Sequence, residues 1–412
     1  MHYFAFKRNT LYCENTRIKK LAEGFGTPLY VYSERTIREH YNKIKKAFKE
    51  VKPLICYSVK ANSNLSILKI IKSLGGGLDI VSGGELYRAK AVKCRPEKIV
   101  YASVGKSEAE IKDALKYGIL MFNVESAAEL ERINSACIKM KKKAKVSLRF
   151  NPDVEPGTHT YITTGKKETK FGLDEGSLKK IFLESKRYKS IVLCGIHIHI
   201  GSQITTSHPF LKALKKVSGI VKYLRTKNIA IDYLNIGGGL GIVYGEEKPQ
   251  TAADFAKKVL PLIKPLSLKL IIEPGRFIVG NAGVLVAKVL YIKDTKSKRF
   301  IIVDAAMNDL IRPSLYDAYH TIVGVDKVKG PPGRSSDIVG PVCESGDFLG
   351  KDRPLKVKEG DYIAVLGAGA YGFSMSSNYN SRPRPAEVLV KNNKTTLVRK
   401  RENYKDLIEK EV

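Results

Sequence analysis

Between residues 50 and 277, short apolar segments alternate with amphipathic, lysine-rich segments. Eight apolar segments have the length and composition of strands: 54–59, 78–82, 99–103, 121–125, 145–151, 192–201, 231–237 and 268–273. The segments between them, such as 66–72 and 108–115, carry apolar residues at helical spacing. Strands that alternate with helices indicate parallel βα units, and eight units predict a closed (β/α)8 TIM barrel. A doubly wound open sheet is the structural alternative.

The pattern changes after residue 280, where strand-like segments become frequent and long helical patterns rare. Strands are predicted at 283–292, 300–304, 361–366 and 386–390, and the first thirty residues also look strand-like. The chain of 412 residues is long enough for two cores. We therefore expect a barrel over 30–280 and a second, β-rich domain of barrel or sandwich type, built from 1–29 and 281–412.

The composition narrows the class of protein. A hydrophobic content of 43% with 27% charged residues is typical of a soluble globular chain. No apolar run is long enough to span a bilayer, and the first eight residues lack the apolar core of a signal peptide. The six cysteines form no Cys-x-x-Cys pair, which argues against a zinc module or a disulfide framework. We expect a cytoplasmic protein without a membrane partner.

The formal net charge of +31 is unusual for such a chain. Nucleic-acid binding is one explanation of so basic a protein. However, the basic residues are spread along the whole sequence, and the chain has no tryptophan. We therefore expect no nucleic-acid partner, and an excess of positive charge would also attract anionic cofactors and dicarboxylates.

A lysine directly follows the first predicted barrel strand, in the stretch Tyr57-Ser58-Val59-Lys60-Ala61-Asn62. For a single lysine, a side chain that extends to solvent from a strand end is the usual explanation. A desolvated lysine amine is also a good nucleophile toward a carbonyl group. Active sites of (β/α)8 barrels lie at the carboxyl ends of the strands. The residues at the other strand ends therefore decide whether Lys60 is a solvent-exposed side chain or a reactive amine.

The ends of the last two predicted strands favour phosphate binding. Strand seven ends in Gly237, Gly238 and Gly239, whose backbone amides can approach a phosphate closely. Strand eight is followed by Gly275 and Arg276, and a guanidinium can donate two hydrogen bonds to a phosphate or carboxylate. The glycines alone are equally typical of a turn, but the loops after strands seven and eight often form the phosphate site of such barrels.

Two histidines on the sixth predicted strand, His197 and His199, would face the same side of it. Metal binding is one possibility, although acidic partners at ligand spacing are absent nearby. His197 is also typical of a core residue, while His199 lies nearer the strand end, where its ring could stack on a planar cofactor. With Lys60 and the phosphate-binding glycines, Glu273 completes a set that fits pyridoxal phosphate, because an acidic residue can keep the pyridine nitrogen protonated.

With these features the chain resembles a known family, the fold-type III pyridoxal phosphate-dependent decarboxylases. Among them it resembles those that act on meso-2,6-diaminopimelate. The resemblance extends over nearly the whole length. Besides the stretches already described, it rests on His197–Gln203, Glu273–Arg276, Gly340–Asp347, Gly369–Gly372 and Ser377–Pro385. These motifs occur in the family's order and at the expected strand ends.

The resemblance implies a role for each site residue. Lys60 would bind the cofactor covalently, Glu273 would pair with its pyridine nitrogen, and His199 would stack on its ring. The cofactor phosphate would be surrounded by Ser202, Gly237, Gly238, Gly239, Gly275, Arg276 and Tyr371. The distal carboxylate of the substrate would be bound by Arg276, Arg312 and Tyr316, and its distal ammonium by Glu344. Tyr371 would also bind the substrate. Cys343 would be the proton donor, and Cys343 and Glu344 would come from the other subunit of a homodimer.

The implied reaction is the decarboxylation of meso-2,6-diaminopimelate to L-lysine and CO2, the last step of lysine biosynthesis. The same chemistry on ornithine, arginine or a carboxylated polyamine is the nearest alternative. Arg312 and Glu344 argue against it, since they suit a substrate whose far end bears both a carboxylate and an ammonium. Alternatives of another class are a catalytically inactive regulatory protein, against which Lys60 and Cys343 argue, and a nucleic-acid binder.

Segment 153–171 is a candidate for a loop that covers the site, and Arg149 is a candidate barrel-lining residue.

Overall fold

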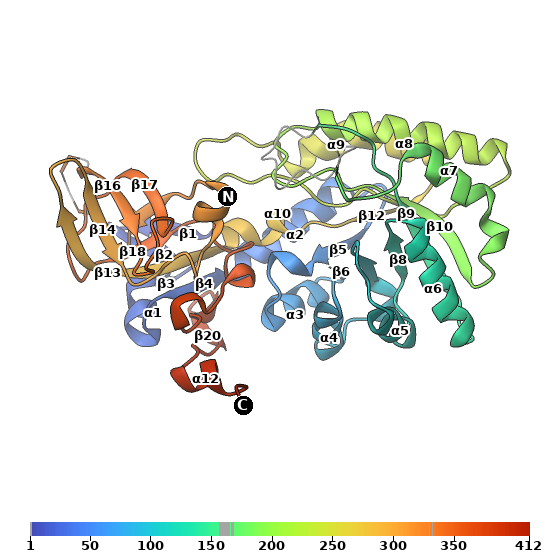
Figure 1. Ribbon diagram of the computed structural model, residues 1–412. Helices are drawn as coiled ribbons and strands as arrows, with labels where there is room; N and C mark the ends of the chain where they lie inside the picture. Colours follow the sequence, from blue (N-terminus) through green and yellow to red (C-terminus); the bar gives the residue numbers. More distant parts are fainter. Residues whose placement is uncertain (1, 156–164, 166–168, 329, 332) are drawn as a thin grey trace. The chain divides into compact units, whose positions relative to one another are not determined.

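The computed structural model describes residues 2–155, 165, 169–328, 330, 331 and 333–412 (Figure 1). The chain divides into two compact units. Unit 1 comprises Met1–His40, Ile242–Glu247 and Ile278–Val412, and unit 2 comprises Tyr41–Gly241 and Lys248–Phe277. Most of the predicted covering segment, 153–171, lies outside the described residues.

Unit 2 contains eight parallel strands that close into a barrel. The strands are β5 (Leu54–Ser58), β6 (Gly77–Ile80), β7 (Ile99–Ala102), β8 (Met121–Val124), β9 (Ala144–Arg149), β10 (Ile191–His197), β11 (Tyr233–Asn235) and β12 (Lys269–Ile272). The last strand pairs with the first, because Ile271 lies opposite Leu54 and Ile272 opposite Ile55. The predicted (β/α)8 barrel is therefore confirmed, and the open doubly wound sheet is excluded.

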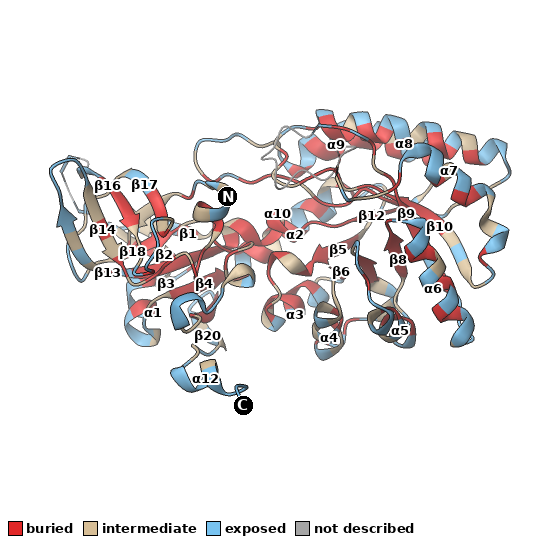
Figure 2. Cartoon of the chain, in the orientation of Figure 1, coloured by how far each residue is buried: buried red, intermediate tan, exposed pale blue. Residues whose placement is uncertain are grey.

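Helices alternate with the barrel strands. They are α2 (Glu34–Ala47), α3 (Leu65–Ser73), α4 (Gly83–Ala91), α5 (Glu108–Tyr117), α6 (Ala127–Lys139), α7 (Glu175–Leu183), α8 (His208–Thr226), α9 (Ala252–Ile263) and α10 (Arg276–Val279). Serine side chains cap the first turns of three of them, with Ser82, Ser107 and Ser126 each accepting a backbone N–H. Figure 2 shows that the barrel strands are buried, while helices such as α5 and α6 expose one face to solvent.

The sixth barrel strand is shorter than predicted. It ends at His197 instead of residue 201, and the chain then leaves the sheet. Ile198 still donates its N–H to the Asn235 carbonyl oxygen (2.8 Å), and the His199 carbonyl then accepts a hydrogen bond from the Arg149 guanidinium (3.2 Å). His199 therefore lies in the loop that follows the strand.

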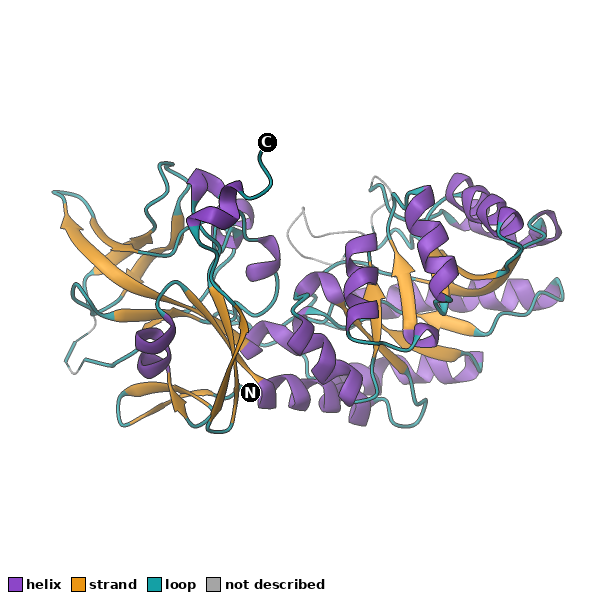
Figure 3. Ribbon diagram, turned by 90° about the horizontal axis from the view of Figure 1, so that it is seen from below, coloured by secondary structure: helices purple, strands orange, loops and turns teal. Residues whose placement is uncertain are grey.

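Unit 1 is rich in β-structure, as predicted, and Figure 3 shows strands in orange. A nine-stranded sheet contains β4 (Leu29–Ser33), β13 (Gly283–Asp294), β14 (Arg299–Val303), β15 (Ile322–Gly324), β16 (Ser335–Val339), β17 (Phe348–Pro354), β18 (Tyr362–Val365), β19 (Ala386–Lys391) and β20 (Lys394–Arg399). The N-terminal segment joins this unit, because β4 pairs with β13 and with β19. Two short helices complete it, α11 (Arg312–Tyr316) and α12 (Tyr404–Ile408).

The first thirty residues are only partly strand, contrary to expectation. They form a small sheet of β1 (Phe4–Lys7), β2 (Thr10–Cys13) and β3 (Thr16–Arg17), followed by helix α1 (Ile18–Phe25). The helix is explained by its buried residues Ile18, Leu21 and Ala22, whose spacing places them on one face. This face packs into the core of unit 1 together with Val31 and Val284.

Among the described residues, no helix combines the length and the hydropathy that a bilayer crossing requires.

Candidate active site

Lys60 lies in a single turn of 3-10 helix, Val59–Ala61, directly after β5. Its Nζ is 2.9 Å from Oδ2 of Asp79, a β6 residue whose side chain is fully buried, while the lysine side chain is 35% exposed. The amine is thus held at the strand end and is still accessible. Burial and the neighbouring Glu273 raise the pKa of Asp79, and Lys60 opposes this shift. The ionisation of Asp79 therefore depends on whether the Lys60 amine carries its positive charge.

A second acidic side chain, Glu85 on α4, belongs to the surroundings of Lys60. Burial raises the pKa of Glu85 to about 7, although Lys60 and the Val81 N–H stabilise its charged form. Glu85 Oε2 accepts that N–H at 2.8 Å. A carboxyl group with this pKa can take up or release a proton near neutral pH. Neither Asp79, within β6, nor Glu85, on α4, was predicted as a site residue.

Glu273 follows β12 directly and is 3% exposed. Its Oε1 accepts hydrogen bonds from Asn123 Nδ2 (3.1 Å) and Asn235 Nδ2 (2.6 Å), and its Oε2 is 3.2 Å from His197 Nε2. Burial alone would raise the pKa of Glu273, but His197, Lys60 and Asn235 stabilise the carboxylate and lower the pKa below its usual value. The barrel thus holds a negative charge in its interior, at the end of the strand next to that of Lys60.

Three further polar side chains were not predicted as partners of Glu273. Asn123, Asn235 and His197 come from β8, β11 and β10 and are buried. In the sequence, the only sign of each residue's role was that a polar side chain interrupted an otherwise apolar strand. Asn235 has a second contact, because its Oδ1 accepts the Gly237 N–H at 2.9 Å. It therefore links the Glu273 carboxylate to the glycine loop.

The glycine loop after β11 approaches other backbone segments so closely that no side chain fits. A Cβ on Gly237 would lie 2.5 Å from the Ile198 carbonyl oxygen, and one on Gly238 would lie 2.2 Å from that of Glu273. Gly237 and Gly239 also have φ angles of +66° and +105°, in the region that glycine favours. The loop thus exposes backbone in place of side chains.

His199 faces this loop, since its Nδ1 accepts the Gly238 N–H at 3.2 Å. Burial lowers the pKa of His199 well below its usual value, and the charges of Arg149 and Lys60 act in the same direction. The ring is therefore neutral at pH 7. Arg149 is buried at the end of β9 and pairs with Glu125 (2.8 Å).

Arg276 begins α10, and its Nη2 and Nε lie 3.0 Å and 3.3 Å from Ser202 Oγ. Both residues belong to the predicted phosphate-binding set and are brought together. Gly275 lies against the Lys60 turn, because a Cβ there would be 3.0 Å from the Cβ atoms of Ala61 and Ser58. Unit 2 therefore gathers the lysine, the histidine, the glycines, Glu273 and the Ser202–Arg276 pair at the strand ends.

The other predicted residues belong to unit 1. Arg312 and Tyr316 lie on α11, and Arg312 is buried. Cys343 and Glu344 are exposed, with the Cys343 N–H bonded to Asn380 Oδ1 (3.0 Å) and Glu344 Oε2 bonded to the Tyr379 hydroxyl (2.8 Å). Tyr371 has a φ of +57°.

Comparisons with known proteins agree with this arrangement. Residues 34–280 match the family described as "Pyridoxal-dependent decarboxylase, pyridoxal binding domain". A diaminopimelate decarboxylase of Aquifex aeolicus is 50% identical over 409 residues, which cover 99% of this chain and 97% of the relative.

Two solved structures extend the similarity to the whole fold. Diaminopimelate decarboxylase from M. jannaschii in co-complex with L-lysine is 40% identical, with a TM-score of 0.94 over 99% of this chain and 97% of that one. The Helicobacter pylori enzyme complexed with L-lysine is 43% identical, with a TM-score of 0.91 over 95% and 98% of the two chains. The chain belongs to the pyridoxal-dependent decarboxylase family.

Proposed function

We propose that the protein decarboxylates meso-2,6-diaminopimelate to L-lysine and CO2 with pyridoxal 5'-phosphate as its cofactor. The observation that carries the proposal is that an accessible amine and a buried carboxylate lie at neighbouring strand ends. Lys60 follows β5 and Glu273 follows β12, and the two strands pair in the barrel. The names of full-length relatives, and the L-lysine in two related structures, support the choice of substrate.

The residues of unit 2 fit pyridoxal phosphate. The cofactor needs a lysine for covalent attachment, a charged partner for its ring nitrogen and donors for its phosphate. Lys60 and Glu273 suit the first two needs, since the Glu273 carboxylate is held ionised by its buried partners. The side-chain-free loop at Gly237–Gly239, with Ser202, Gly275 and Arg276, suits a phosphate group. We add Tyr371 to this phosphate-binding set.

When bound, the cofactor supplies an electron sink for the electron pair that remains as CO2 departs. The residues of the chain perform the remaining tasks. With the cofactor bound, the Glu273 carboxylate would favour a proton on the ring nitrogen, and the neutral His199 would stack on the ring without adding charge there. Asp79 and Glu85 stabilise the protonated Lys60 amine whenever it is released. The Cys343 thiol donates a proton to the carbon that has lost its carboxylate.

Recognition of the distal end of the substrate distinguishes the proposed reaction from the same chemistry on ornithine or arginine. We assign the distal carboxylate to Arg276, Arg312 and Tyr316 and the distal ammonium to Glu344, with Tyr371 as a further substrate-binding residue. A substrate without a second carboxylate would offer the buried Arg312 guanidinium no carboxylate to bind.

We further propose a homodimer in which Cys343 and Glu344 of one subunit serve the active site of the other. Both residues are exposed in the single chain, which supports a role toward a partner. A cytoplasmic location is consistent with cysteines that are all free, five of them buried.

Substrate-specific CO2 release tests the proposal. The purified protein is supplied with pyridoxal phosphate and given meso-diaminopimelate, ornithine or arginine separately. We expect CO2 from meso-diaminopimelate alone, with formation of L-lysine. Release from ornithine but not from diaminopimelate would overturn the substrate assignment.

Replacement of Lys60 provides the internal control for the chemistry. Lys60→Ala should abolish CO2 release and the visible absorbance of covalently bound cofactor. The variant should elute on gel filtration like the parent protein, since Lys60 is partly exposed. Visible absorbance that survives dialysis of the variant would show that another lysine holds the cofactor.

A further inference from the structure

Arg312 occupies an unusual position for a charged residue, since it is 6% exposed at the start of α11 in unit 1. A buried guanidinium requires partners that satisfy its donors. One of them is His320, whose Nε2 lies 2.7 Å from Arg312 Nη1. His320 is itself fully buried. The contact is therefore shielded from water and is stronger than it would be at the surface.

The hydrogen bonds of His320 determine its tautomer. Its Nδ1 lies 2.8 Å from the Leu366 carbonyl oxygen, which can only accept, so Nδ1 carries the proton. A guanidinium can only donate, so Nε2 presents its lone pair to Arg312. The imidazole is therefore neutral. It orients the guanidinium and leaves the positive charge in place, whereas a carboxylate in the same position would cancel that charge.

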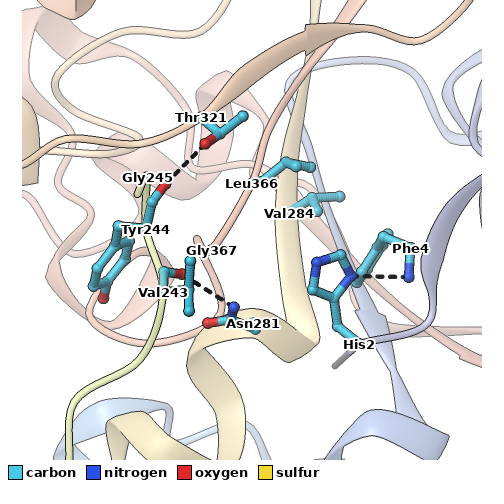
Figure 4. Close-up of a pocket in the computed structure, with 10 residues that line it drawn as sticks. All are labelled: His2, Phe4, Val243, Tyr244, Gly245, Asn281, Val284, Thr321, Leu366 and Gly367. Atoms are coloured by element: carbon cyan, nitrogen blue, oxygen red, sulfur yellow. Dashed lines mark hydrogen bonds between the residues drawn. The ribbon is translucent and has the colours of Figure 1, made fainter. Parts of the chain in front are cut away.

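Tyr244 supports the guanidinium from a second direction. Arg312 Cζ lies 4.6 Å from the centroid of the Tyr244 ring, a cation–π contact, and the same ring meets His320 edge-on at 5.0 Å. The Tyr244 backbone is fixed in turn, because Thr321 Oγ1 donates to its carbonyl oxygen at 2.8 Å (Figure 4). The Tyr244 N–H bonds to Glu247 Oε2 at 3.0 Å.

We propose that His320 and Tyr244 are positioning residues that aim Arg312 at the distal carboxylate of the substrate. This inference rests on the proposed function, in which Arg312 binds that carboxylate. A guanidinium that must form two parallel hydrogen bonds to a carboxylate gains affinity only when its plane is correctly oriented. His320 fixes the position of one Nη atom and Tyr244 fixes the plane. Neither residue needs to touch the substrate.

Binding of two ligands to the cofactor-loaded enzyme tests the inference without turnover. L-Lysine, the product, retains the distal carboxylate, whereas 1,5-diaminopentane lacks it. In His320→Leu, titration calorimetry should show L-lysine affinity reduced by about tenfold or more, the usual effect of losing one hydrogen bond to a charged group. The affinity for 1,5-diaminopentane should stay unchanged. Equal loss for both ligands, or no loss for either, would overturn the inference.

A conservative variant separates positioning from general support of the fold. Gln at position 320 can still accept a hydrogen bond from Arg312, so His320→Gln should recover part of the L-lysine affinity. In the decarboxylation assay, His320→Leu should raise KM for meso-diaminopimelate more than it lowers kcat. His208→Leu, at an exposed histidine on α8, is the matched control and should change neither value.

Tyr244→Leu provides an independent variant if leucine at position 320 prevents folding. Tyr244 borders a cavity of about 400 Å³ in unit 1, shared with Val243, Thr321, Leu366 and Gly367 (Figure 4). The variant should show the same selective loss of L-lysine affinity, and an unchanged ligand preference would contradict the inference.

Arg312→Ala distinguishes failure of this inference from failure of the proposed function. If this variant binds L-lysine as the parent does, Arg312 does not recognise the carboxylate and the proposed function is wrong at this point. If it binds L-lysine weakly while His320→Leu and Tyr244→Leu do not, only the positioning roles are wrong. If the inference holds, His320→Leu should add little further loss in an Arg312→Ala background.

Discussion

Several acidic residues of this protein are buried deeply enough for their protonation to affect its stability. Asp309 in unit 1 is a clear example, since burial raises its pKa to about 7 although the Ala306 N–H opposes the shift. Its carboxyl accepts that N–H at 2.9 Å. An ordinary aspartic acid releases its proton near pH 3.8 in an unfolded chain. The native state therefore binds this proton more tightly than the unfolded state does.

We expect this difference to appear as a pH dependence of the free energy of unfolding. Between about pH 4 and pH 7 the native state holds more protons at this site, so its contribution to stability falls as the pH rises. The steepest slope for one such group is about 1.4 kcal/mol per pH unit. Asp309→Asn keeps the acceptor for Ala306 and removes the titration. The urea unfolding midpoint of Asp309→Asn should therefore rise relative to that of the parent protein as the pH rises from 4 to 7.

Comparing the parent protein with Asp309→Asn isolates the titration of Asp309, because the two proteins share all other titrating groups. Above about pH 7 the difference should become constant, since both states of the parent have then released the proton. A difference that stays constant from pH 4 to pH 7 would show that Asp309 is already ionised in the native protein.

Asn235 shows how one side chain can join two parts of a site. It donates to Glu273 and accepts from the Gly237 N–H, so its loss affects the carboxylate and the glycine loop together. We expect Asn235→Ala to weaken pyridoxal phosphate binding by about tenfold or more, since it removes a hydrogen bond to a charged group. Fluorescence titration of the cofactor-free protein measures the affinity.

Asn235→Asp tests the electrostatic part of the argument. Asp can still accept the Gly237 N–H, but it places a second carboxylate beside Glu273 and favours protonation of one of the pair. Binding should therefore weaken at least as much as in Asn235→Ala, and low pH should relieve part of the loss. Asn393→Ala, in an exposed turn of unit 1, is the control. Cofactor affinity equal to that of the parent in both Asn235 variants would exclude the linking role.

The strand-to-helix loops of the barrel depend on close contact between backbone segments. In the loop after β11, a Cβ on Gly238 would meet the Glu273 carbonyl oxygen at 2.2 Å, and a backbone atom of a barrel strand end has little freedom to move. We expect Gly238→Ala to displace the loop, destabilise the protein by about 1–3 kcal/mol and weaken cofactor binding. Thermal unfolding and fluorescence titration measure the two effects.

Gly219 is the matched control for this prediction. It lies in the interior of α8, and a Cβ there would meet nothing within 4 Å. Gly219→Ala should stabilise the protein by up to about 1 kcal/mol, because alanine favours the helix more than glycine does. If Gly238→Ala were as stable and bound the cofactor as tightly as Gly219→Ala, the close approach would not constrain the loop.

The proposed homodimer makes a prediction about the complete assembly. If Lys60 and Cys343 of different subunits form each active site, a mixed dimer of Lys60→Ala and Cys343→Ala carries one site with both changes and one site with neither. Equal amounts of the two inactive variants, allowed to exchange subunits, should give about a quarter of the parent activity, since half of the dimers are mixed.

Activity should rise with the time allowed for exchange and should be absent in either variant alone. Sedimentation of the parent protein provides the independent measurement of its mass. No recovered activity, with subunit exchange demonstrated by labelling, would place both residues of each site in one chain.

Much of the architecture was predictable because it depends on local patterns. The alternation of apolar and amphipathic segments predicted all eight barrel strands, and the β-rich texture after residue 280 predicted the character of unit 1. Strand ends were less accurate, as at His197, because a strand ends where pairing ends and not where apolar residues end. The helix at Ile18–Phe25 was missed, since its apolar face needs the core of unit 1 to bury it.

The residue types at the strand ends were enough to predict the cofactor chemistry, because a lysine, a glycine loop, an arginine and a glutamate each have a characteristic partner in pyridoxal phosphate. Barrel closure decided which buried side chains surround that set. Asn123 on β8 and His197 on β10 meet Glu273 from strands that do not pair with β12, whereas Asn235 meets it from β11, which does. Tyr244 likewise reaches Arg312 from a segment distant in the sequence, whereas His320 is eight residues from it. The contacts between distant segments depend on long-range packing, which no local spacing of residues encodes.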